Sequence, residues 1–402
     1  MAGKKNIFFL FFLLLWCAVS LCPQNASDAA SGKEPRLGVW ITVFTPEKVL
    51  FSKASADRLI GRCRTSGIDH IYLQVYRADK AYYDSDITDR SAYEKMLKEA
   101  GGDNIKYLIR EAHKSGIKVY AWLNLLSISQ NSGANILKKY GNQVLTRDQH
   151  GRTSLRKGDK DKLDKYYIRE NQLFLEPGDE RVRSYLASIA AEIMKKYPDL
   201  DGLHLDYVRY PAVVPFSPGS RFISHGLGYG YVKTNLDNFK KNTGLNARTM
   251  EGSRDNYRKW DDWHRDQVTT LVKDISGRVK ALSPSAEISC TIVPSIERTH
   301  LVTFQDWTEW LREGYVDYVT VMNYTDDTKL LELNSGSMLL PEVEEKVYIG
   351  VGAYLLKKKT AVLKEQLSYL IELSPAGIVI FSYDDIADNE ELQVFLEKNF
   401  KG

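Results

Sequence analysis

Cysteine is scarce in this chain, and its scarcity excludes several kinds of site. Only four cysteines occur in 402 residues, and two of them, Cys17 and Cys22, belong to an N-terminal leader-like stretch. Cys63 and Cys290 lie far apart in the sequence and are more typical of small buried apolar groups than of a disulfide. No spacing of cysteine and histidine resembles a zinc site, so neither a metal nor another cofactor is predicted.

An excess of charge of either sign is also lacking. The 55 lysine and arginine residues nearly balance the 52 aspartate and glutamate residues, which leaves a formal net charge of +3. Because there is no basic run, nothing in the charge pattern predicts binding to nucleic acid. The glycine-rich stretch 226–230 follows no strand directly, so it is more typical of a flexible loop than of a phosphate-binding loop.

The N-terminus carries a long apolar run. Lys4 and Lys5 precede this run, which ends near Leu21 and is too short to span a bilayer comfortably. We therefore expect residues 1–22 to be an export signal, with a retained signal anchor as the alternative. Lipidation of Cys22 would anchor the mature chain to a membrane, while a cleavage site within 25–31 would release it. The mature chain is expected in the periplasm or associated with the cell envelope.

Residues 23–35 are small and polar and predict a linker, and residues 36–402 predict one domain in which apolar strands and helices alternate. The expected strands are 37–43, 68–76, 117–124, 201–206, 287–293, 316–322, 347–351 and 377–381. The expected helices are 56–65, one between Asp103 and Gly116, 178–196, 255–282, 304–312, 360–373 and 388–400.

Eight strands with helical crossovers predict a parallel sheet. We predict the α/β class and a (β/α)8 TIM barrel, with enlarged loops after strand three (125–177) and strand four (210–253). An open doubly wound sheet is the main alternative, but it would need a nucleotide fingerprint or a clear switch point, and neither is found.

The stretch around Asp206 is the most informative in the chain. Asp206 ends an apolar strand, because Pro211 cannot join a ladder and makes Tyr210 extended or part of a turn. A charged side chain in such a strand is costly to bury unless it is paired or lies at the strand end. The carboxyl ends of barrel strands are where active sites form, so Asp206 is predicted to be catalytic. Asp206 could instead cap the next segment or pair with Arg209.

The other strand ends are predicted to surround Asp206 with aromatic rings, amides and carboxylates, and no pair of a nucleophilic serine and a histidine is evident. Aromatic faces stack on sugar rings and amides bind hydroxyl groups, so the lining favours a carbohydrate substrate. The predicted glycan-binding residues are Trp40, Gln74, Trp122, Asn124, His204, Arg209, Tyr210, Asn323, Tyr324 and Tyr354.

Glycoside hydrolysis usually needs two carboxyl groups, one protonated and one ionised. Asp206 is the first candidate. Glu297, after strand five, and Asp326, after strand six, are candidates for the second. Glu176 is a further candidate, although its Glu-Pro-Gly-Asp-Glu context is more typical of the start of a helix.

Several motifs together resemble the glycosyl-hydrolase-like family 10, a family of exported bacterial barrels. The resemblance runs from about Arg36 to beyond Phe381 and is carried by Arg36-Leu37-Gly38-Val39-Trp40-Ile41-Thr42, Ala121-Trp122-Leu123-Asn124, Leu175-Glu176-Pro177-Gly178, Asp201-Gly202-Leu203-His204-Leu205-Asp206-Tyr207-Val208-Arg209-Tyr210-Pro211, Gln305-Asp306-Trp307 and Met322-Asn323-Tyr324.

This resemblance implies a glycosidase acting on cell-wall glycan, and specifically on peptidoglycan strands that have lost their stem peptides. The expected partner is therefore a polysaccharide. Two alternatives remain open: the protein hydrolyses another extracellular polysaccharide, or it is a barrel that binds glycan without cleaving it.

Overall fold

The computed structural model describes residues 35–155, 170–212 and 228–400. The export signal predicted for 1–22, the lipidation predicted at Cys22 and nearly all of the linker predicted for 23–35 lie outside the described residues, as do positions 226 and 227 of the glycine-rich stretch. Across the described ranges, no helix combines the length and apolar character that a membrane crossing requires.

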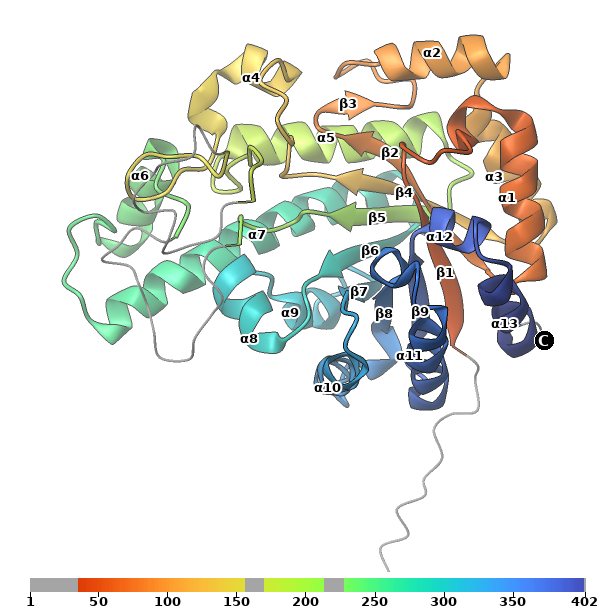
Figure 1. Ribbon diagram of the computed structural model, residues 1–402. Helices are drawn as coiled ribbons and strands as arrows, with labels where there is room; N and C mark the ends of the chain where they lie inside the picture. Colours follow the sequence, from red (N-terminus) through yellow and green to blue (C-terminus); the bar gives the residue numbers. More distant parts are fainter. Residues whose placement is uncertain (1–34, 156–169, 213–227, 401–402) are drawn as a thin grey trace, which may run out of the picture. The chain divides into compact units, whose positions relative to one another are not determined.

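Eight parallel strands close into a barrel (Figure 1). The first strand pairs with the second and with the last, Gly38 aligning with His70 on one side and with Val379 on the other. A two-residue strand, β3, adds antiparallel to the end of β2. The strands are β1 Arg36–Ile41, β2 His70–Arg77, β3 Lys80–Ala81, β4 Lys118–Asn124, β5 Gly202–Asp206, β6 Glu287–Ile292, β7 Tyr318–Met322, β8 Val347–Gly352 and β9 Gly377–Phe381.

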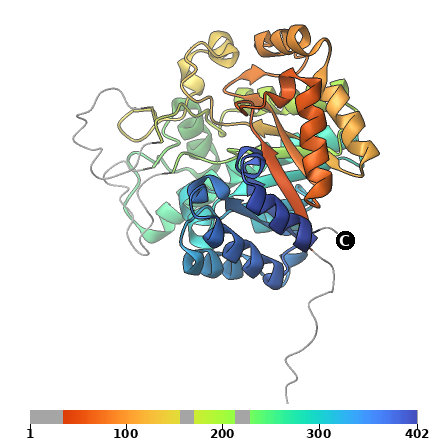
Figure 2. The same cartoon turned by 45° about the vertical axis from the view of Figure 1, so that its right-hand side comes forward.

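The prediction of a (β/α)8 barrel is therefore confirmed, and the eight predicted strands match the barrel strands to within a few residues. Closure brings the two ends of the domain together, so in Figure 2 the C-terminal helices, in blue, lie beside the first strand, in red. The pairing of β1 with β2, which closes the eight parallel strands into a ring, distinguishes this fold from the open sheet considered as the alternative.

Helices surround the barrel. They are α1 Lys53–Thr65, α2 Ser91–Ala100, α3 Asn104–Lys114, α4 Asn135–Tyr140, α5 Glu180–Lys196, α6 Lys233–Thr243, α7 Arg254–Leu282, α8 Ile296–Arg298, α9 Trp307–Arg312, α10 Thr328–Met338, α11 Thr360–Leu373, α12 Tyr383–Ala387 and α13 Glu390–Phe400.

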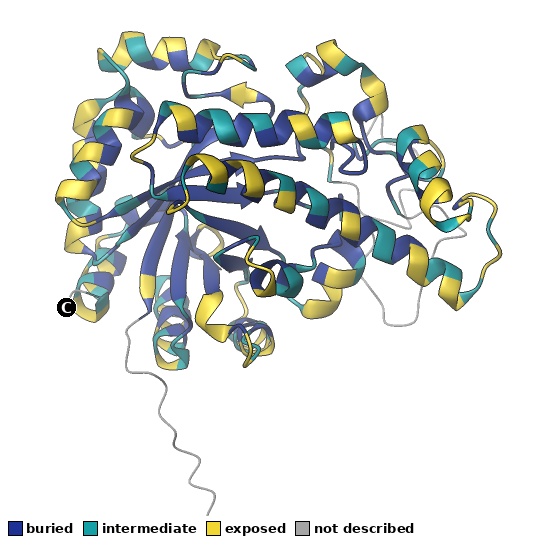
Figure 3. Ribbon diagram, turned by 180° about the vertical axis from the view of Figure 1, so that it is seen from behind, coloured by how far each residue is buried: buried dark blue, intermediate teal, exposed yellow. Residues whose placement is uncertain are grey.

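Local chemistry fixes several helix ends. The Asp103 carboxylate accepts hydrogen bonds from the backbone N–H groups of Ile105 and Lys106 and so caps α3, the helix predicted between Asp103 and Gly116. Helix α5 begins two residues later than predicted, because Asp179 accepts a hydrogen bond from the N–H of Arg181 and acts as the cap. Figure 3 shows the resulting pattern: the barrel strands are almost wholly buried, while the long helices seen in this view bury one stripe and expose the other.

The space inside the barrel is filled mainly by rings rather than by branched aliphatic side chains. Trp40, Tyr72, Tyr120, Trp122, Tyr318 and Tyr348 form one buried cluster with Val379. Glycine provides the room for the largest of these rings: a Cβ atom at Gly350 would lie 2.8 Å from the Trp40 indole. Interior positions in barrels of this kind are usually filled by valine, isoleucine and leucine, so this interior is unusually aromatic and polar.

The two predicted enlarged loops follow β4 and β5, where Figure 1 shows the arrowheads of these strands directed toward α4 and α6. The first loop is not structureless, because isolated bridges join Ser127 to Phe174 and Leu145 to Leu175. Both loops leave the carboxyl ends of the strands and therefore extend the face of the barrel on which Asp206 lies.

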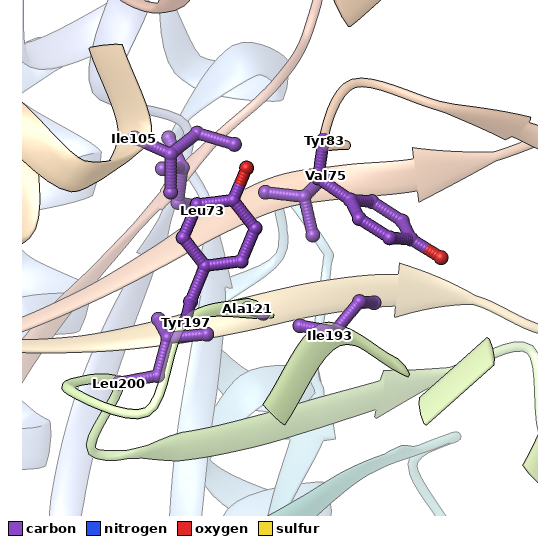
Figure 4. Close-up of a pocket in the computed structure, with 8 residues that line it drawn as sticks. All are labelled: Leu73, Val75, Tyr83, Ile105, Ala121, Ile193, Tyr197 and Leu200. Carbon is purple, nitrogen blue, oxygen red and sulfur yellow. The ribbon is translucent and has the colours of Figure 1, made fainter. Parts of the chain in front are cut away.

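A packing gap lies on the outer side of β2 and β4, beneath α3 and α5 (Figure 4). Its apolar lining leaves no space wide enough for a water molecule, so the gap is part of the core and not a ligand site. It is lined by Leu73, Val75, Tyr83, Ile105, Ala121, Ile193, Tyr197 and Leu200.

Candidate active site

Asp206 is the last residue of β5 and is held by three hydrogen bonds. The Thr291 hydroxyl donates to Oδ1 at 2.6 Å, and the backbone N–H of Tyr207 donates to the same oxygen at 2.7 Å. The Trp122 indole Nε1 donates to Oδ2 at 3.1 Å. The side chain is thus fixed from β4, from β6 and from the turn after β5, at the carboxyl end of the barrel.

The protonation of Asp206 reflects opposing effects. Burial raises the pKa of Asp206 above its ordinary value, because a charge is poorly solvated inside the protein. The bonds from Thr291, the Tyr207 N–H and Trp122 act in the opposite direction, as does the positive charge of Arg209. A buried carboxylate with three donors aimed at it can accept a hydrogen bond or attack carbon without first rearranging.

The turn after Asp206 has an unusual backbone. Tyr207 has a φ of +54°, in the left-handed region that residues with a Cβ atom rarely adopt. In this conformation its N–H points back to Asp206. Local conformation and carboxylate position are therefore coupled at this strand end.

Aromatic rings gather beside Asp206. The Phe381 ring meets Trp122 edge-on, with centroids 6.3 Å apart, and stacks on Tyr324 at 5.6 Å. Trp40 lies edge-on to both Phe381 and Tyr324. Tyr354 contacts Tyr324 and Phe381 at the outer side of this group and is 43% exposed. The structure therefore brings four predicted glycan-binding residues, Trp40, Trp122, Tyr324 and Tyr354, to the surroundings of Asp206.

His204 lies one layer deeper than Asp206 on β5 and is fully buried. Its Nε2 accepts a hydrogen bond from the Trp40 indole at 2.9 Å, so the ring proton is on Nδ1 and is donated to Ser289 Oγ at 2.8 Å. Burial lowers the pKa of His204 to about 3, so the ring is neutral. This histidine fixes the Trp40 indole and makes no exposed surface for a ligand.

Gln74 and Asn124 form a buried amide pair next to the same rim. The Gln74 Nε2 donates to Asn124 Oδ1 at 2.9 Å, and its Oε1 accepts from the backbone N–H of Val43. Asn124 stands directly beside Asp206 in the β4–β5 register. Both predicted amides are thus close to the carboxylate.

Other predicted glycan-binding residues are engaged by the protein. Arg209 pairs with Glu170 and not with Asp206, so the ion pair considered as an alternative role for Asp206 is not formed. The Tyr210 hydroxyl donates to Glu176 at 2.6 Å. The Asn323 amide donates to the Leu331 carbonyl and to Ser335 Oγ and accepts from Asn334, which ties β7 to α10.

The two predicted partner carboxylates are exposed. Glu297 accepts from the Ser295 hydroxyl on α8, and local hydrogen bonds lower its pKa. Asp326 pairs with Lys359 at 2.8 Å, which lowers its pKa as well. A proton donor at neutral pH needs a raised pKa, so neither position has the environment that this role requires.

Two carboxyl groups other than Glu297 and Asp326 have raised pKa values. Asp384, just after β9, is half-buried, and burial together with Asp385 and Asp388 raises its pKa. The Thr45 hydroxyl donates to its Oδ1 at 2.5 Å. Glu176 is fully buried, and burial raises its pKa to about 7 against the hydrogen bonds that it accepts from Tyr210, Thr146 and the Gly178 N–H.

Thr291 and Phe381 were missed by reasoning from the sequence. A signal for Thr291 exists, because Glu287, Ser289 and Thr291 alternate with apolar residues along β6 and so share the inner face of the barrel. Phe381 ends β9 and could have been included with the other residues at strand ends. Within the described part of the chain, no group of three or more His, Cys, Asp or Glu side chains is arranged to bind a metal ion.

A closed parallel barrel that holds a buried carboxyl group among aromatic rings at a strand's carboxyl end has the architecture of the (β/α)8-barrel glycosidases. The chain belongs to the glycosyl hydrolase-like 10 family, which matches residues 36–365.

Two curated relatives carry this similarity. Glycosyl hydrolase YngK of Bacillus subtilis is 25% identical over 346 residues, covering 80% of this chain and 60% of the relative. Glycosyl hydrolase DigH of Escherichia coli K12 is 24% identical over 282 residues, covering 64% of this chain and 55% of the relative. The chain thus spans little more than half the length of these proteins.

Solved structures share the fold. The PgaB (BpsB) glycoside hydrolase domain from Bordetella bronchiseptica superposes with a TM-score of 0.66 at 14% identity and covers 90% of this chain and 98% of its own. The catalytic domain of a β-amylase from Paenibacillus polymyxa gives a TM-score of 0.55 at 12% identity, covering 92% and 98%.

Proposed function

We propose that this protein is an exported glycoside hydrolase that cleaves cell-wall glycan, and specifically peptidoglycan strands that have lost their stem peptides. Membership of the glycosyl hydrolase-like 10 family supports the reaction class. The observation that carries the proposal is the environment of Asp206, a buried carboxylate with three donors at the rim of the barrel.

In the proposed reaction, Asp206 acts in its ionised form. It either attacks the anomeric carbon or activates the water that does, while a second group protonates the leaving oxygen. The three donors hold the carboxylate in place and, among the described residues, leave Oδ2 with Trp122 as its one hydrogen-bond partner. Which of the two routes operates is decided by the anomeric configuration of the first product, measured by NMR.

We assign the proton donor to Asp384. It lies past the end of β9, three residues after Phe381, and Phe381 contacts the Trp122 ring that binds Asp206. Its raised pKa keeps a proton available nearer to neutral pH than Glu297 or Asp326 would. Its Oδ1 accepts from Thr45, which leaves Oδ2 for the substrate.

The preference for peptidoglycan strands without stem peptides follows from their charge. Removal of the peptides leaves a carboxylate on each muramic acid. Arg77 ends β2 and lies over the Phe44 ring at 4.8 Å, and among the residues that the structure describes no carboxylate is paired with it. Phe44 itself is 63% exposed. This cation and ring would bind an anionic sugar, since a guanidinium pairs well with a carboxylate.

The experiment is incubation of the purified protein with glycan strands stripped of peptides, with intact peptidoglycan and with uncharged and amino-bearing polysaccharides. Release of short oligosaccharides from the stripped strands is the expected result. Cleavage of another polymer alone would mean that this polysaccharide, and not peptidoglycan, is the substrate. Binding without any release would make the protein a glycan-binding barrel.

Export is proposed from the leader predicted for residues 1–22. Intact-mass measurement of the mature protein from cell envelopes distinguishes a lipidated Cys22 from cleavage within 25–31. An unprocessed N-terminus recovered from the cytoplasm would contradict export.

A further inference from the structure

Arg209 carries a positive charge near Asp206, but its guanidinium is already paired with another side chain of the protein. Glu170 faces it in a two-pronged ion pair, with Nη1 to Oε1 at 2.7 Å and Nη2 to Oε2 at 3.1 Å. The same Glu170 Oε1 accepts the backbone N–H of Ala212 at 2.6 Å, and Nη1 also donates to the Tyr210 carbonyl. Both side chains are nearly buried, at 11% and 15% exposure.

The guanidinium plane lies against two rings. It stands 5.0 Å from the Tyr207 ring and 5.7 Å from the Phe174 ring. Tyr207 and Phe174 contact each other at 5.9 Å. Tyr207 is the residue with the left-handed backbone whose N–H binds Asp206 Oδ1. A continuous set of contacts therefore runs from Glu170 through Arg209 and Tyr207 to Asp206.

We propose that Arg209 is a positioning residue: locked by Glu170, it clamps the Tyr207 ring and thereby aims the Asp206 carboxylate. Arg209 then serves the reaction without contacting the glycan, in contrast to the glycan-binding role expected from the sequence. A planar, two-pronged guanidinium suits this task, because it can pair with a carboxylate and stack on rings simultaneously.

Among the residues that the structure describes, Arg209 is the cation that acts on Asp206. The groups around the carboxylate are the Trp122 indole, the Thr291 hydroxyl, the phenols of Tyr207 and Tyr324 and the Cys290 thiol. Burial raises the pKa of both phenols and of the thiol, so they stay neutral, and His204 beneath them is neutral too. Arg209 lowers the pKa of Asp206, and Glu170 offsets that positive charge.

The test uses two single variants that remove opposite charges. Glu170→Gln leaves the Arg209 charge without its counter-ion and should lower the pKa of Asp206, whereas Arg209→Gln should raise it, each by about half a unit or more. The readout is the ¹³C NMR titration of the Asp206 carboxyl in protein carrying ¹³C-labelled aspartate, assigned by its loss in Asp206→Asn. This measurement needs no substrate, so it is independent of the proposed peptidoglycan specificity.

Lys280→Gln is the matched control. Lys280 pairs with Asp317 at the opposite end of the barrel, at 3.0 Å, so this variant also removes one positive charge from an ion pair. It should leave the Asp206 titration unchanged, because solvent ions screen the longer distance.

Kinetics separate positioning from glycan binding. Arg209→Lys keeps the charge but loses the two-pronged pairing and the flat stacking surface. We expect kcat to fall about tenfold or more with KM within about twofold of the wild type. A raised KM with unchanged kcat would overturn the proposal and make Arg209 a glycan ligand. Shifts of the Asp206 titration in the same direction in both charge variants, or none in either, would overturn it as well. If Arg209→Gln fails to fold, Glu170→Gln and Arg209→Lys still decide.

Discussion

The Trp122 indole and the Asp206 carboxylate are joined across neighbouring strands by a hydrogen bond of 3.1 Å. This bond joins the aromatic interior of the barrel to its buried carboxylate. Because Phe381 meets the indole edge-on and itself stacks on Tyr324, the indole cannot move without disturbing the rest of the aromatic group. One side chain therefore both lines the site and helps to lower the pKa of its reactive group against the effect of burial.

Replacing this indole by a ring without a donor isolates the hydrogen bond. Trp122→Phe should lower kcat by roughly 10–100-fold, because a hydrogen bond to a charged group contributes about 1.5–3 kcal/mol. The lost donor should also raise the pKa of Asp206, so the acidic limb of the pH–rate profile should move to higher pH. Trp307→Phe, which removes a buried indole at the start of α9, is the control for loss of bulk alone. An unmoved acidic limb would mean that Asp206 is not the group that titrates in it.

Removing the charge of Asp206 tests its central assignment. Asp206→Asn should lower turnover of the cleaved glycan by about 10²–10⁴-fold or more, with binding largely retained. Binding is measured by calorimetry with the same oligosaccharide. Asp201→Asn makes the same change at the amino end of β5, where Asp201 binds the Val119 N–H, and should leave kcat nearly unchanged. Full activity in Asp206→Asn would refute the assignment.

The sequence was informative wherever a residue's role follows from its position along a strand. The carboxyl end of β5 could be located from the alternation of apolar residues and from Pro211, and this was sufficient to place Asp206 at the rim. The polar residues on the inner face of β6 could have revealed Thr291 in the same way. Helices α2, α6 and α10 are among those that were not predicted, because each buries only two or three side chains.

Side-chain partners could not be predicted. Arg209 and Tyr210 lie only three and four residues after Asp206 in the sequence, yet Glu170 and Glu176 bind them from the other enlarged loop. Asn323 follows β7, but its side-chain amide donates a hydrogen bond to the Leu331 carbonyl of α10. Which loops meet is decided by the packing of the whole barrel, so a polar residue at a strand end could not be assigned to substrate or to protein from the sequence.

Substrates with different leaving groups test the assignment of Asp384 as the proton donor. Asp384→Asn should lower hydrolysis of the natural glycan by about 10²–10⁴-fold and should affect aryl glycosides with acidic phenols much less, because such leaving groups need no proton. It should also abolish the alkaline limb of the pH–rate profile.

Glu297→Gln and Asp326→Asn provide the comparison for this choice. Their carboxylates are exposed and have lowered pKa values, so we expect changes of less than about threefold. If the loss of activity in one of these two variants instead depends on the leaving group, the residue changed in that variant is the proton donor, as first predicted from the sequence, and Asp384 is not.

Arg77 offers a test of substrate charge. Arg77→Gln should lower kcat/KM on strands with free muramic carboxylates by roughly tenfold, since a charge-assisted hydrogen bond is lost. Activity on the same strands after amidation of these carboxylates should be nearly unaffected. Lys80→Gln, which removes an exposed charge from β3 nearby, is the control. Equal losses of kcat/KM on both substrates would show that Arg77 does not bind the muramic carboxylate.

Glu176 should make the stability of the fold depend on pH. Its carboxyl group has a pKa raised from 4.5 to about 7 in the folded protein. Between these values the unfolded chain has already released the proton that the folded protein keeps, so the free energy of unfolding falls as pH rises. The full effect is about 3 kcal/mol, at roughly 1.4 kcal/mol per unit.

This contribution is isolated by comparing urea unfolding of the wild type and Glu176→Gln at several values between pH 4.5 and pH 7.5. The difference between the two free energies should change by a few kcal/mol across this range, while the difference for Glu111→Gln, a partly exposed carboxylate on α3 whose pKa is lowered instead of raised, should not fall as pH rises. A flat difference for Glu176→Gln would show that the buried carboxyl is ionised in the folded protein at neutral pH. In that case the hydrogen bonds from Tyr210, Thr146 and Gly178 would outweigh the cost of burial.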